Sequence, residues 1–292
     1  MKTRIITVIM MGLFVDMTIQ AQEKALSLNT SDGQVVWTVA PQDQSPASGQ
    51  EVSRVGFAFG DGVNATVPGV VFTDYVNAGR EENPDLADNI YRVDETKYSK
   101  PYWYRTEFDA SSLNAAAIHY WLCFDNTNRY ADFYFNGHKI SGTEESTKDV
   151  SGHMLRSRFD VTPYYNRQGK NAIAVLIYDT DQKKTRKAEG PYGVACSPSY
   201  LAGAGWDWMP YVPGRLAGIT GNCYVATSGD AVMEDPWIRS YLPSLDKAEL
   251  QFSTDVRNLS GERKTVTVSG VIMPGNISFE KKVQLRPNEK RM

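Results

Sequence analysis

The residues in this sequence best suited to chemistry are two tryptophans that flank an aspartate, Trp206, Asp207 and Trp208. Carboxylates bind sugars by accepting hydrogen bonds from hydroxyl groups, while aromatic faces cover the C–H surfaces of the ring. Gly205 and Pro210 bound the motif, which indicates a rigid loop rather than a strand or a helix. A second interpretation is that the loop plugs a core and that Asp207 caps backbone N–H groups. Composition alone leaves both interpretations open.

The overall composition excludes several other classes of function. The 292 residues include 31 Lys and Arg against 34 Asp and Glu, which gives a net charge of −3. Without a basic excess, we expect no nucleic-acid partner. The chain holds 16 Tyr and 6 Trp but only 3 His, a balance that suits a sugar-facing β protein. The histidines (His119, His138 and His153) have no spacing that would join ligands, so we expect no metal and no cofactor.

The three cysteines give little further information. They show no CxxC spacing, which excludes a zinc ribbon and a redox pair. Cys123 lies in an apolar strand pattern and is predicted to be a small buried residue. A disulfide between Cys196 and Cys223 is left open by the sequence.

The N-terminus has the layout of a secretory signal peptide. Lys2 and Arg4 form a positive region, an apolar run from Ile5 to Val15 follows, and Ala21 offers a small residue for cleavage. The run is too short to span a bilayer, and no later stretch is long and apolar enough to do so. We therefore expect residues 1–21 to be removed and the product to be periplasmic or extracellular, soluble and not membrane-bound.

Short strands separated by turn signals must position the candidate loop. Runs rich in β-favouring residues occur at Tyr102–Asp109, Ala117–Asp125, Ala131–Phe135 and Ala172–Tyr178. Asn136-Gly137 predicts a tight hairpin, and the apolar run to Tyr178 predicts a strand covered on both faces. No long amphipathic helix is expected, beyond brief helical turns near Val70–Ala78. This spacing predicts an all-β sandwich.

A second unit is expected to begin near Asp230. Ala248–Asn258 alternates between apolar and polar residues, with Leu250, Phe252 and Val256 on one face. Lys264–Val271 and Ile277–Leu285 repeat the alternation around a turn at Pro274-Gly275. Half-buried antiparallel strands of this kind are typical of an immunoglobulin-like sandwich, but three or four of them cannot close one. We expect this second sandwich to be incomplete.

An ordered series of motifs carries a resemblance to a known family. The series comprises Val67-Pro68-Gly69-Val70, Pro101-Tyr102-Trp103-Tyr104-Arg105, Phe108, Leu122-Cys123-Phe124-Asp125, Arg129, Ala131, Asn136-Gly137, Ile140, Phe159-Asp160-Val161-Thr162, Gly205–Pro210, Gly218-Ile219 and Asp235-Pro236-Trp237-Ile238. In this order it resembles the N-terminal part of glycoside hydrolase family 2 enzymes, in particular the β-mannosidase, exo-β-glucosaminidase and β-galactosidase-like branch. The match runs from about residue 35 to the end of the sequence.

The resemblance implies a domain organisation and a function. It implies a jelly-roll sugar-binding-type domain over 22–229 and a partial immunoglobulin-like domain over 230–292. In such enzymes a (β/α)₈ barrel with two catalytic glutamates follows, and no βα repeats occur in this sequence. Asn288-Glu289 follows Pro287 in a polar turn, so we do not assign it as the acid/base pair. The chain is thus expected to be the non-catalytic N-terminal part of a secreted retaining exo-β-glycosidase, inactive alone and completed by the C-terminal barrel of the same polypeptide.

The resemblance also implies which residues meet a β-linked oligosaccharide or glycoside. Asp207 would contact hydroxyls of the terminal sugar, with Trp206 and Trp208 shaping the loop. Asn89 matches a position near that site, although an Asx-turn role explains it equally well. Arg105 and Asp125 are interpreted as structural. The acidic pairs Glu81-Glu82 and Glu144-Glu145 are interpreted as surface charges in polar loops.

Two other classes of function remain as alternatives. The chain would be a free-standing carbohydrate-binding β-sandwich if its isolated form bound oligosaccharides through Asp207. It would be a purely structural assembly domain if it bound no glycan. The identity of the sugar, whether mannose, glucosamine or galactose, cannot be assigned from the sequence.

Overall fold

The computed structural model describes residues 23–110, 113, 117–128, 130–141, 150–151, 155–178 and 213–292. These residues divide into two units. The large unit comprises Lys24–Ala116 and Tyr120–Ala226, and the small unit comprises Ala117–His119 and Thr227–Met292, together with Glu23.

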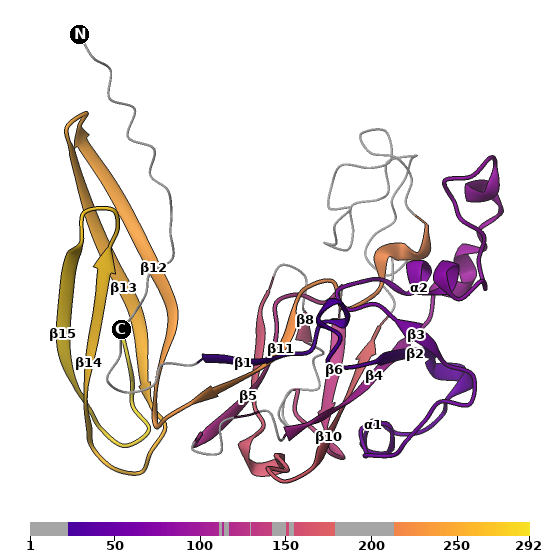
Figure 1. The fold of residues 1–292 in the computed structure, drawn as a ribbon, viewed down its shortest axis with the longest axis horizontal. Helices are drawn as coiled ribbons and strands as arrows, with labels where there is room; N and C mark the ends of the chain where they lie inside the picture. Colours follow the sequence, from indigo (N-terminus) through magenta and orange to yellow (C-terminus); the bar gives the residue numbers. More distant parts are fainter. Residues whose placement is uncertain are drawn as a thin grey trace, which may run out of the picture. The chain divides into compact units, whose positions relative to one another are not determined.

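The large unit is a sandwich of two antiparallel sheets (Figure 1). One sheet has the strand order β1-β11-β5-β9 and the other has the order β3-β2-β4-β10-β6-β7, with β8 paired to β6. The strands are β1 (Glu23–Ser27), β2 (Trp37–Pro41), β3 (Val63–Ala65), β4 (Tyr102–Asp109), β5 (His119–Phe124), β6 (Tyr130–Phe135), β7 (His138–Lys139), β8 (Val150–Ser151), β9 (Ser157–Asp160), β10 (Lys170–Ile177) and β11 (Cys223–Ser228). The all-β sandwich predicted from the sequence is confirmed.

Helices are short and lie in the connections between strands. The α-helices are α1 (Gly49–Val52) and α2 (Val71–Asn77), and the 3-10 turns are η1 (Thr30–Asp32), η2 (Gln42–Gln44), η3 (Asn89–Arg92), η4 (Glu95–Tyr98), η6 (Thr162–Tyr164) and η7 (Gly214–Leu216). A capping box starts α1, because the Ser48 side chain accepts from the Glu51 N–H and the Glu51 carboxylate accepts from the Ser48 N–H. The helical segment expected near Val70–Ala78 is α2, which is only seven residues long.

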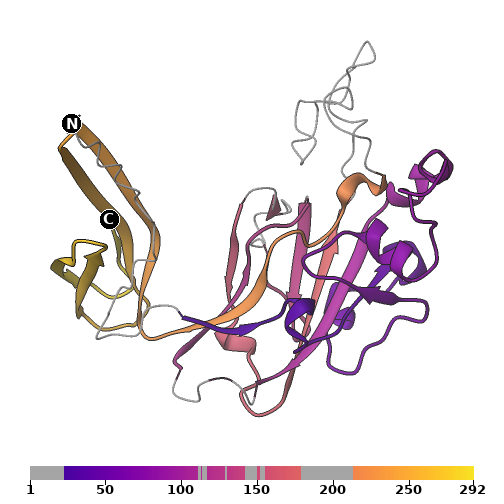
Figure 2. The same ribbon diagram turned by 45° about the horizontal axis from the view of Figure 1, so that its top comes forward.

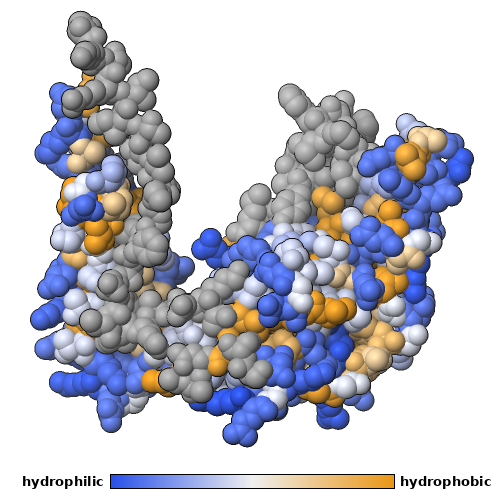
Figure 3. Space-filling model, in the orientation of Figure 1, coloured by the Kyte–Doolittle hydropathy of each residue, from blue (hydrophilic) through white to orange (hydrophobic). Residues whose placement is uncertain are grey.

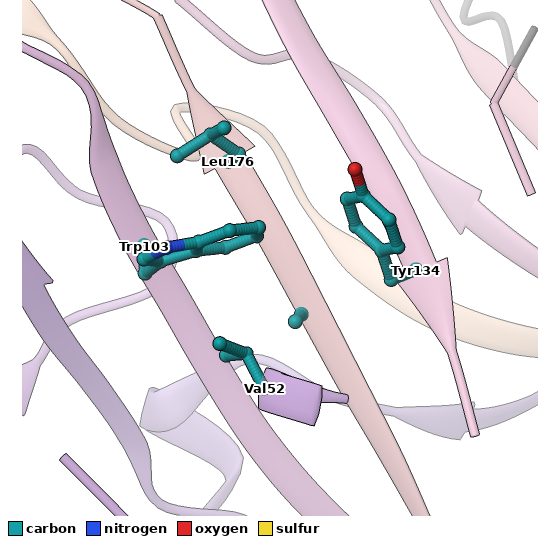
Figure 4. Packing of buried hydrophobic residues seen from close by; sticks show 5 residues of the cluster. Val52, Trp103, Tyr134 and Leu176 are labelled. Carbon is teal, nitrogen blue, oxygen red and sulfur yellow. The ribbon is translucent and has the colours of Figure 1, made fainter. Parts of the chain in front are cut away.

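The central strand β10 is covered on both faces, as its apolar run predicts. On one face Ala174 and Leu176 pack with Val52 of α1, Trp103 of β4 and Tyr134 of β6 (Figure 4). The opposite face contributes Ile173, Val175 and Ile177, all fully buried. Burial of both faces leaves the strand no solvent side, which is why its sequence does not alternate.

Aromatic side chains fill the space between the two sheets of the large unit. Phe133 of β6 lies 4.7 Å from Phe124 of β5 and 4.8 Å from Phe159 of β9, measured between ring centroids. Tyr120 of β5 stacks on Tyr165 at 3.9 Å. Such contacts add about 1 kcal/mol each beyond the burial of area, so they hold the two sheets in register.

The predicted hairpin forms at Asn136-Gly137. Both residues have positive φ, +47° and +85°, and β6 pairs with β7 directly across the turn. The Asn136 side chain further bonds to the carbonyl of Tyr164 and to the N–H of Ala172. The turn therefore fixes the connection between β6 and β7 and also joins it to β10.

The small unit contains a three-stranded sheet, β12-β13-β16, and a two-stranded sheet, β14-β15. Its strands are β12 (Ala231–Ser244), β13 (Lys247–Asn258), β14 (Lys264–Ile272), β15 (Ile277–Leu285) and β16 (Lys290–Arg291). Val256, Val266, Val268 and Leu285 form its core together with Ala231. Leu250, expected on the buried face of β13, is instead 47% exposed, because the burial is confined to the end of the strand near Val256.

Several strands, among them β1, β2, β3 and β12, were not expected from the sequence. β1, β2 and β3 are three to five residues long, too short to show an alternation of apolar and polar residues. β12 is long, but Pro236 and Pro243 interrupt its pattern. Asp235 has a φ of +49°, and the pairing of β12 with β13 shifts register between Glu234 and Trp237. A bulge of this kind moves side chains to the other face and so hides the strand from pattern analysis.

Candidate functional site

The predicted loop residues Trp206, Asp207 and Trp208 lie outside the described residues, within the segment 179–212. The structure does describe the two ends of that segment, where the chain leaves β10 at Tyr178 and re-enters at Pro213. The described part of the candidate site is therefore the set of contacts made at these two ends.

The re-entry point is the turn η7, which packs against α2 in both views (Figures 1 and 2). Gly214 has a φ of +78°, and a Cβ placed there would lie 2.3 Å from the Cβ of Phe72. The Gly214 N–H donates to the Glu95 carboxylate at 2.9 Å. Only glycine fits this conformation and this close approach together, so η7 is held against α2 and η4.

The chain that follows η7 is bound on two sides by backbone hydrogen bonds. Asn128 and Gly218 exchange a pair of them, at 2.8 and 3.0 Å, and the Asn128 side chain donates to the Leu216 carbonyl at 2.8 Å. On the other side, the Gly69 N–H donates to the Ile219 carbonyl at 2.8 Å. A Cβ on Gly218 would lie 2.3 Å from the Gly69 carbonyl oxygen, so the two segments touch backbone to backbone.

Tyr178, the last described residue before the segment 179–212, is held by residues of β6. Its N–H donates to the Tyr130 carbonyl at 2.9 Å, and its hydroxyl donates to the Asp132 carboxylate at 2.9 Å. Asp132 is buried and also bonds to Lys139 and Ser141, so the acceptor is itself fixed. Since Tyr130 and Asn128 are two residues apart, both ends of the segment 179–212 are tied to one short stretch of chain.

Asn89 has a local role in the structure. It is the first residue of η3, its side-chain amide donates to the Asn83 carbonyl at 3.0 Å, and its N–H donates to the Leu86 carbonyl at 3.2 Å. These bonds close the loop between Asn83 and Asn89. The segment that carries Asn89 continues into η4, whose Glu95 binds Gly214, but whether Asn89 meets a sugar stays a prediction.

A buried carboxyl group on α2 gave no signal in the sequence. Asp74 is fully buried, and its Oδ1 accepts from the Thr66 N–H at 2.7 Å. Burial raises the pKa of Asp74 to about 7, which the hydrogen bond from Thr66 opposes. The Tyr104 hydroxyl is a further neighbour that favours the charged form. An aspartate on a seven-residue helix shows no periodicity that would reveal its burial.

Arg105 is structural, as predicted. Its guanidinium donates to the carbonyls of Val52 at 3.0 Å and Arg54 at 2.8 Å and pairs with the Glu107 carboxylate. The side chain is 9% exposed, so its hydrogen bonds are all spent inside the protein. Asp125 likewise serves the fold, because it accepts from the Asn222 side chain at 2.9 Å.

The acidic pairs fall into different environments. Glu81 was expected on the surface but exposes only 10% of its side chain and pairs with Lys97 at 2.8 Å. That interpretation was wrong, because η4 folds back over the end of α2 and brings Lys97 to it. Glu82 is exposed, and Glu144-Glu145 lies outside the described residues. Glu289 closes a turn by accepting from the Arg286 N–H at 2.6 Å, in agreement with its assignment as a polar turn.

The cysteines and candidate metal ligands of the described residues form no further site. Cys123 is buried, as predicted, and Cys223 is buried as well. Cys196, the other half of the disulfide left open above, lies outside the described residues. Among the residues that the structure describes, no group of three His, Cys, Asp or Glu could hold a metal ion, and no helix is long and apolar enough to cross a membrane.

A family model described as "glycosyl hydrolase 2 galactose-binding domain-like" matches residues 37–221. This range includes Tyr178, Gly214, Gly218 and the segment 179–212. The chain belongs to this family. The family assignment agrees with the resemblance found in the motif series. It places the Trp-Asp-Trp motif inside the matched region.

Longer enzymes are similar to the chain over most of its length. An exo-β-D-glucosaminidase of Streptomyces avermitilis is 27% identical over 241 residues, which are 82% of this chain and 24% of that enzyme. A mannosylglycoprotein endo-β-mannosidase of Lilium longiflorum is 27% identical over 221 residues, which are 69% of this chain and 21% of the enzyme. The chain thus spans about a fifth to a quarter of the length of these curated relatives.

Solved structures of similar fold are also longer enzymes. The crystal structure of the exo-chitosanase CsxA of Amycolatopsis orientalis matches with a TM-score of 0.68 at 20% identity, covering 91% of this chain and 28% of that one. A β-D-mannosidase of Dictyoglomus thermophilum matches with a TM-score of 0.60 at 16% identity, covering 91% of this chain and 30% of that one. At these identities the likeness concerns the fold alone.

Proposed function

We propose that the chain is the non-catalytic N-terminal part of a secreted retaining exo-β-glycosidase. Two findings support this: the family assignment, and the similarity to exo-β-D-glucosaminidases over a fifth to a quarter of their length. The catalytic glutamate pair belongs, in this proposal, to a (β/α)₈ barrel of the longer enzyme. The substrate is the non-reducing end of a β-linked oligosaccharide, with glucosaminide and mannoside as the first candidates from the names of the relatives.

The role proposed for this chain is to present Asp207 to the terminal sugar. The observation that carries the proposal is the anchoring of both ends of the segment 179–212 to the stretch Asn128–Tyr130. A recognition group must be held within about an ångström of its productive position to contribute to catalysis. A loop whose two ends are fixed by hydrogen bonds to the sandwich meets that demand better than one whose ends are free. Trp206 and Trp208 then restrict the orientation of Asp207.

The direct test is an assay of the isolated chain with aryl β-D-glucosaminides and aryl β-D-mannosides. We expect no hydrolysis above the buffer background, because retaining hydrolysis needs two carboxyl groups on opposite sides of the scissile bond. Turnover that persists after repeated purification would overturn the proposal. A glutamate substitution that abolished such turnover would place the catalytic pair inside this chain.

A chimera tests the positive half of the proposal. The matching N-terminal region of the Amycolatopsis orientalis exo-β-D-glucosaminidase, which is 27% identical over 230 residues, is replaced by this chain. We expect a folded chimera to cleave an aryl β-D-glucosaminide, since this region would complete the terminal-sugar site. A folded but inactive chimera would argue against that role.

Export is tested separately from catalysis. Residues 1–21 are proposed to direct secretion and to be cleaved after Ala21. Mass spectrometry of the protein recovered from a Gram-negative host should give a mature chain that begins at Gln22. Recovery of the uncleaved chain from the cytoplasm would contradict the proposed localisation.

A further inference from the structure

One edge of the three-stranded sheet in the small unit is open. Among the residues that the structure describes, β13 pairs with β12 along one side, and along the other side it pairs only with β16, at Val256 and Arg257. Within this part of the chain, residues 247–255 of β13 thus have no strand on the side of β16 (Figure 1). A row of unpaired N–H and C=O groups is a template for a further strand.

The direction of the backbone groups along this open edge follows from the hydrogen bonds at the end of β13. The Asn258 N–H donates to the Glu289 carbonyl at 2.8 Å, on the side of β16, and the Leu259 N–H donates to the Asp230 carbonyl at 2.7 Å, on the side of β12. Backbone groups alternate in this way along a strand. The residues that present their N–H and C=O groups at the open edge are therefore Ala248, Leu250, Phe252 and Thr254.

The two edges of this sheet differ in their protection against pairing. β12, at the other edge, contains Pro236, Pro243 and the register shift described above, and proline has no N–H to offer a neighbouring strand. Residues 248–254 of β13, by contrast, contain no proline, no glycine and a single charged residue, Glu249. Of these two edges, the one formed by β13 is thus ready to pair.

Apolar side chains accompany the open edge. Leu250 is 47% exposed, and Phe252 is half-buried with its ring centroid 5.2 Å from that of Phe279 in β15. A cavity of about 520 Å³ lies beside them, lined by residues 251–254 of β13 and by Phe279 and Val283 of β15. Figure 3 shows hydrophobic surface among the hydrophilic residues of the small unit, at the left. A strand added to β13 would cover the backbone edge and the Leu250 side chain together.

We propose that the open edge of β13 pairs with the same edge of a second copy of this chain, antiparallel and about a two-fold axis at Gln251. Gln251 is the middle residue of the open stretch, so this register uses all of it. It sets Leu250 of one copy opposite Phe252 of the other, and these pairs exchange backbone hydrogen bonds. It also brings Lys247 toward Asp255 of the other copy, a contact between opposite charges.

Other registers are less favourable. A slip by one residue would turn the apolar side chains of the second copy to the opposite face of the sheet. A pairing centred on Phe252 would set Glu249 opposite Asp255, and two like charges directly opposite each other destabilise a sheet. A pairing centred on Leu250 would leave the C-terminal end of the open stretch opposite the turn that precedes β13. The residues of the edge therefore favour the register at Gln251.

The dimer should be weak, because the paired edge is short. Such a contact buries less than the roughly 1,200 Å² at which stable interfaces begin, so we expect a dissociation constant of about 10–100 µM. The pairing should stop at two copies, since the β12 edge is interrupted by proline. Sedimentation equilibrium of the full chain between about 1 and 500 µM should then show monomer and dimer and no larger species.

Two matched leucine variants locate the contact. Leu250→Lys places a charge on the open edge, the device by which natural edge strands avoid pairing, and should raise the dissociation constant about tenfold or more. Leu242→Lys makes the same change on β12, where the side chain is 71% exposed, and should leave the dissociation constant unchanged. Thermal unfolding of each variant shows that the fold is retained.

Cysteine variants test the register. Gln251 lies opposite itself across the proposed axis, in a pair without hydrogen bonds whose Cα atoms are about 4.5 Å apart, within the range of a disulfide. Gln251→Cys should therefore form a cross-linked dimer under mild oxidation. Glu249→Cys should form one only when it is mixed with Ser253→Cys, because these two positions lie opposite each other. The unsubstituted chain, oxidised in parallel, corrects for its own cysteines.

Three outcomes would overturn the inference. One is a chain that stays monomeric up to about 500 µM. A second is a dimer that Leu250→Lys leaves unchanged and Leu242→Lys abolishes, which would assign the contact to β12. A third is cross-linking of Glu249→Cys alone without any cross-linking of Gln251→Cys, which would refute the register. Failure of the glycosidase proposal would leave the result untouched, because Asp207→Ala is not expected to alter the oligomeric state.

Discussion

The backbone N–H of Gly214 donates a 2.9 Å hydrogen bond to the carboxylate of Glu95, 119 residues earlier in the chain. The bond joins η4 to the point where the chain returns from the segment that carries Asp207. A backbone donor bound by a carboxylate is stronger than a neutral pair, so the contact limits the movement of η7. The role proposed for the segment 179–212 requires fixed attachments of this kind at its ends.

Glu95→Ala should loosen the attachment without unfolding the protein. Loss of the acceptor leaves the Gly214 N–H without the carboxylate and should cost about 1 kcal/mol of local stability. Hydrogen exchange followed by mass spectrometry should show the amides of residues 214–217 exchanging about fivefold faster. Glu95→Gln retains a side-chain oxygen acceptor and should restore most of the protection. Exchange in Glu95→Ala as slow as in the natural protein would mean that the carboxylate does not hold η7.

Gly214→Ala should destabilise the large unit strongly. The φ of +78° disfavours any residue with a Cβ, and that Cβ would lie 2.3 Å from the Cβ of Phe72. Together the strain and the overlap should lower the free energy of unfolding by about 2–4 kcal/mol, measured by urea denaturation. Gly60→Ala is the matched control, because a Cβ at Gly60 meets no atom within 4 Å. A similar midpoint shift for both variants would contradict the proposed close packing of η7.

Asp74 should make stability fall as the pH rises. Burial raises the pKa of this carboxyl to about 7, above its usual value of 3.8. Between these two values the folded state keeps a proton that the unfolded chain has released, so the free energy of unfolding decreases with rising pH. The resulting loss is complete above pH 7 and amounts to roughly 4 kcal/mol relative to acidic solution.

Asp74→Asn removes that proton and keeps an oxygen acceptor for the Thr66 N–H. The stability of the variant relative to the natural protein should therefore increase between about pH 4 and pH 8, as followed by chemical denaturation at each pH. Asp88→Asn, at an exposed carboxyl paired with Arg92, should leave the pH profile parallel to that of the natural protein. A constant difference between Asp74→Asn and the natural protein across this range would show that Asp74 does not titrate abnormally.

Arg105→Met should be severely destabilising, as measured by urea denaturation. The guanidinium binds two backbone carbonyls and Glu107, and the side chain is 9% exposed. Its removal leaves these acceptors unpaired and should cost about 3 kcal/mol. Arg105→Lys should rescue only part of the loss, because an ammonium group cannot span the same acceptors. Full stability in Arg105→Met would show that the arginine is dispensable for the fold.

Local sequence patterns predicted the strands that are regular and the turns that local residue types determine. β4 matches its predicted bounds, Tyr102–Asp109, and the Asn136-Gly137 turn forms because its residues accept positive φ. β12 was not predicted, because its prolines and its register shift break the alternation. Patterns thus succeed where the strand is regular and fail where a bulge intervenes.

The candidate site was less predictable than the fold. The motif at Trp206–Trp208 is visible in the sequence, whereas the residues that attach the ends of its segment to the sandwich are not. Glu95, Asn128 and Gly218 act through contacts with chain segments about 90 to 120 residues away, and such contacts leave no local pattern. The low exposure of Glu81 escaped prediction for the same reason, since Glu81 stands in a polar stretch and loses most of its exposure only when η4 folds over it.

The most direct measurement of the central claim compares Asp207→Ala with an unsubstituted chimera that joins this chain to the remainder of the Amycolatopsis orientalis exo-β-D-glucosaminidase. The quantity to measure is kcat/KM for an aryl β-D-glucosaminide, with Asp88→Asn as a control on the exposed surface. If Asp207 binds the terminal sugar through charge-assisted hydrogen bonds, its removal should lower kcat/KM by about 100-fold, and the control should change it less than about twofold. An Asp207→Ala chimera as active as its parent would contradict the account.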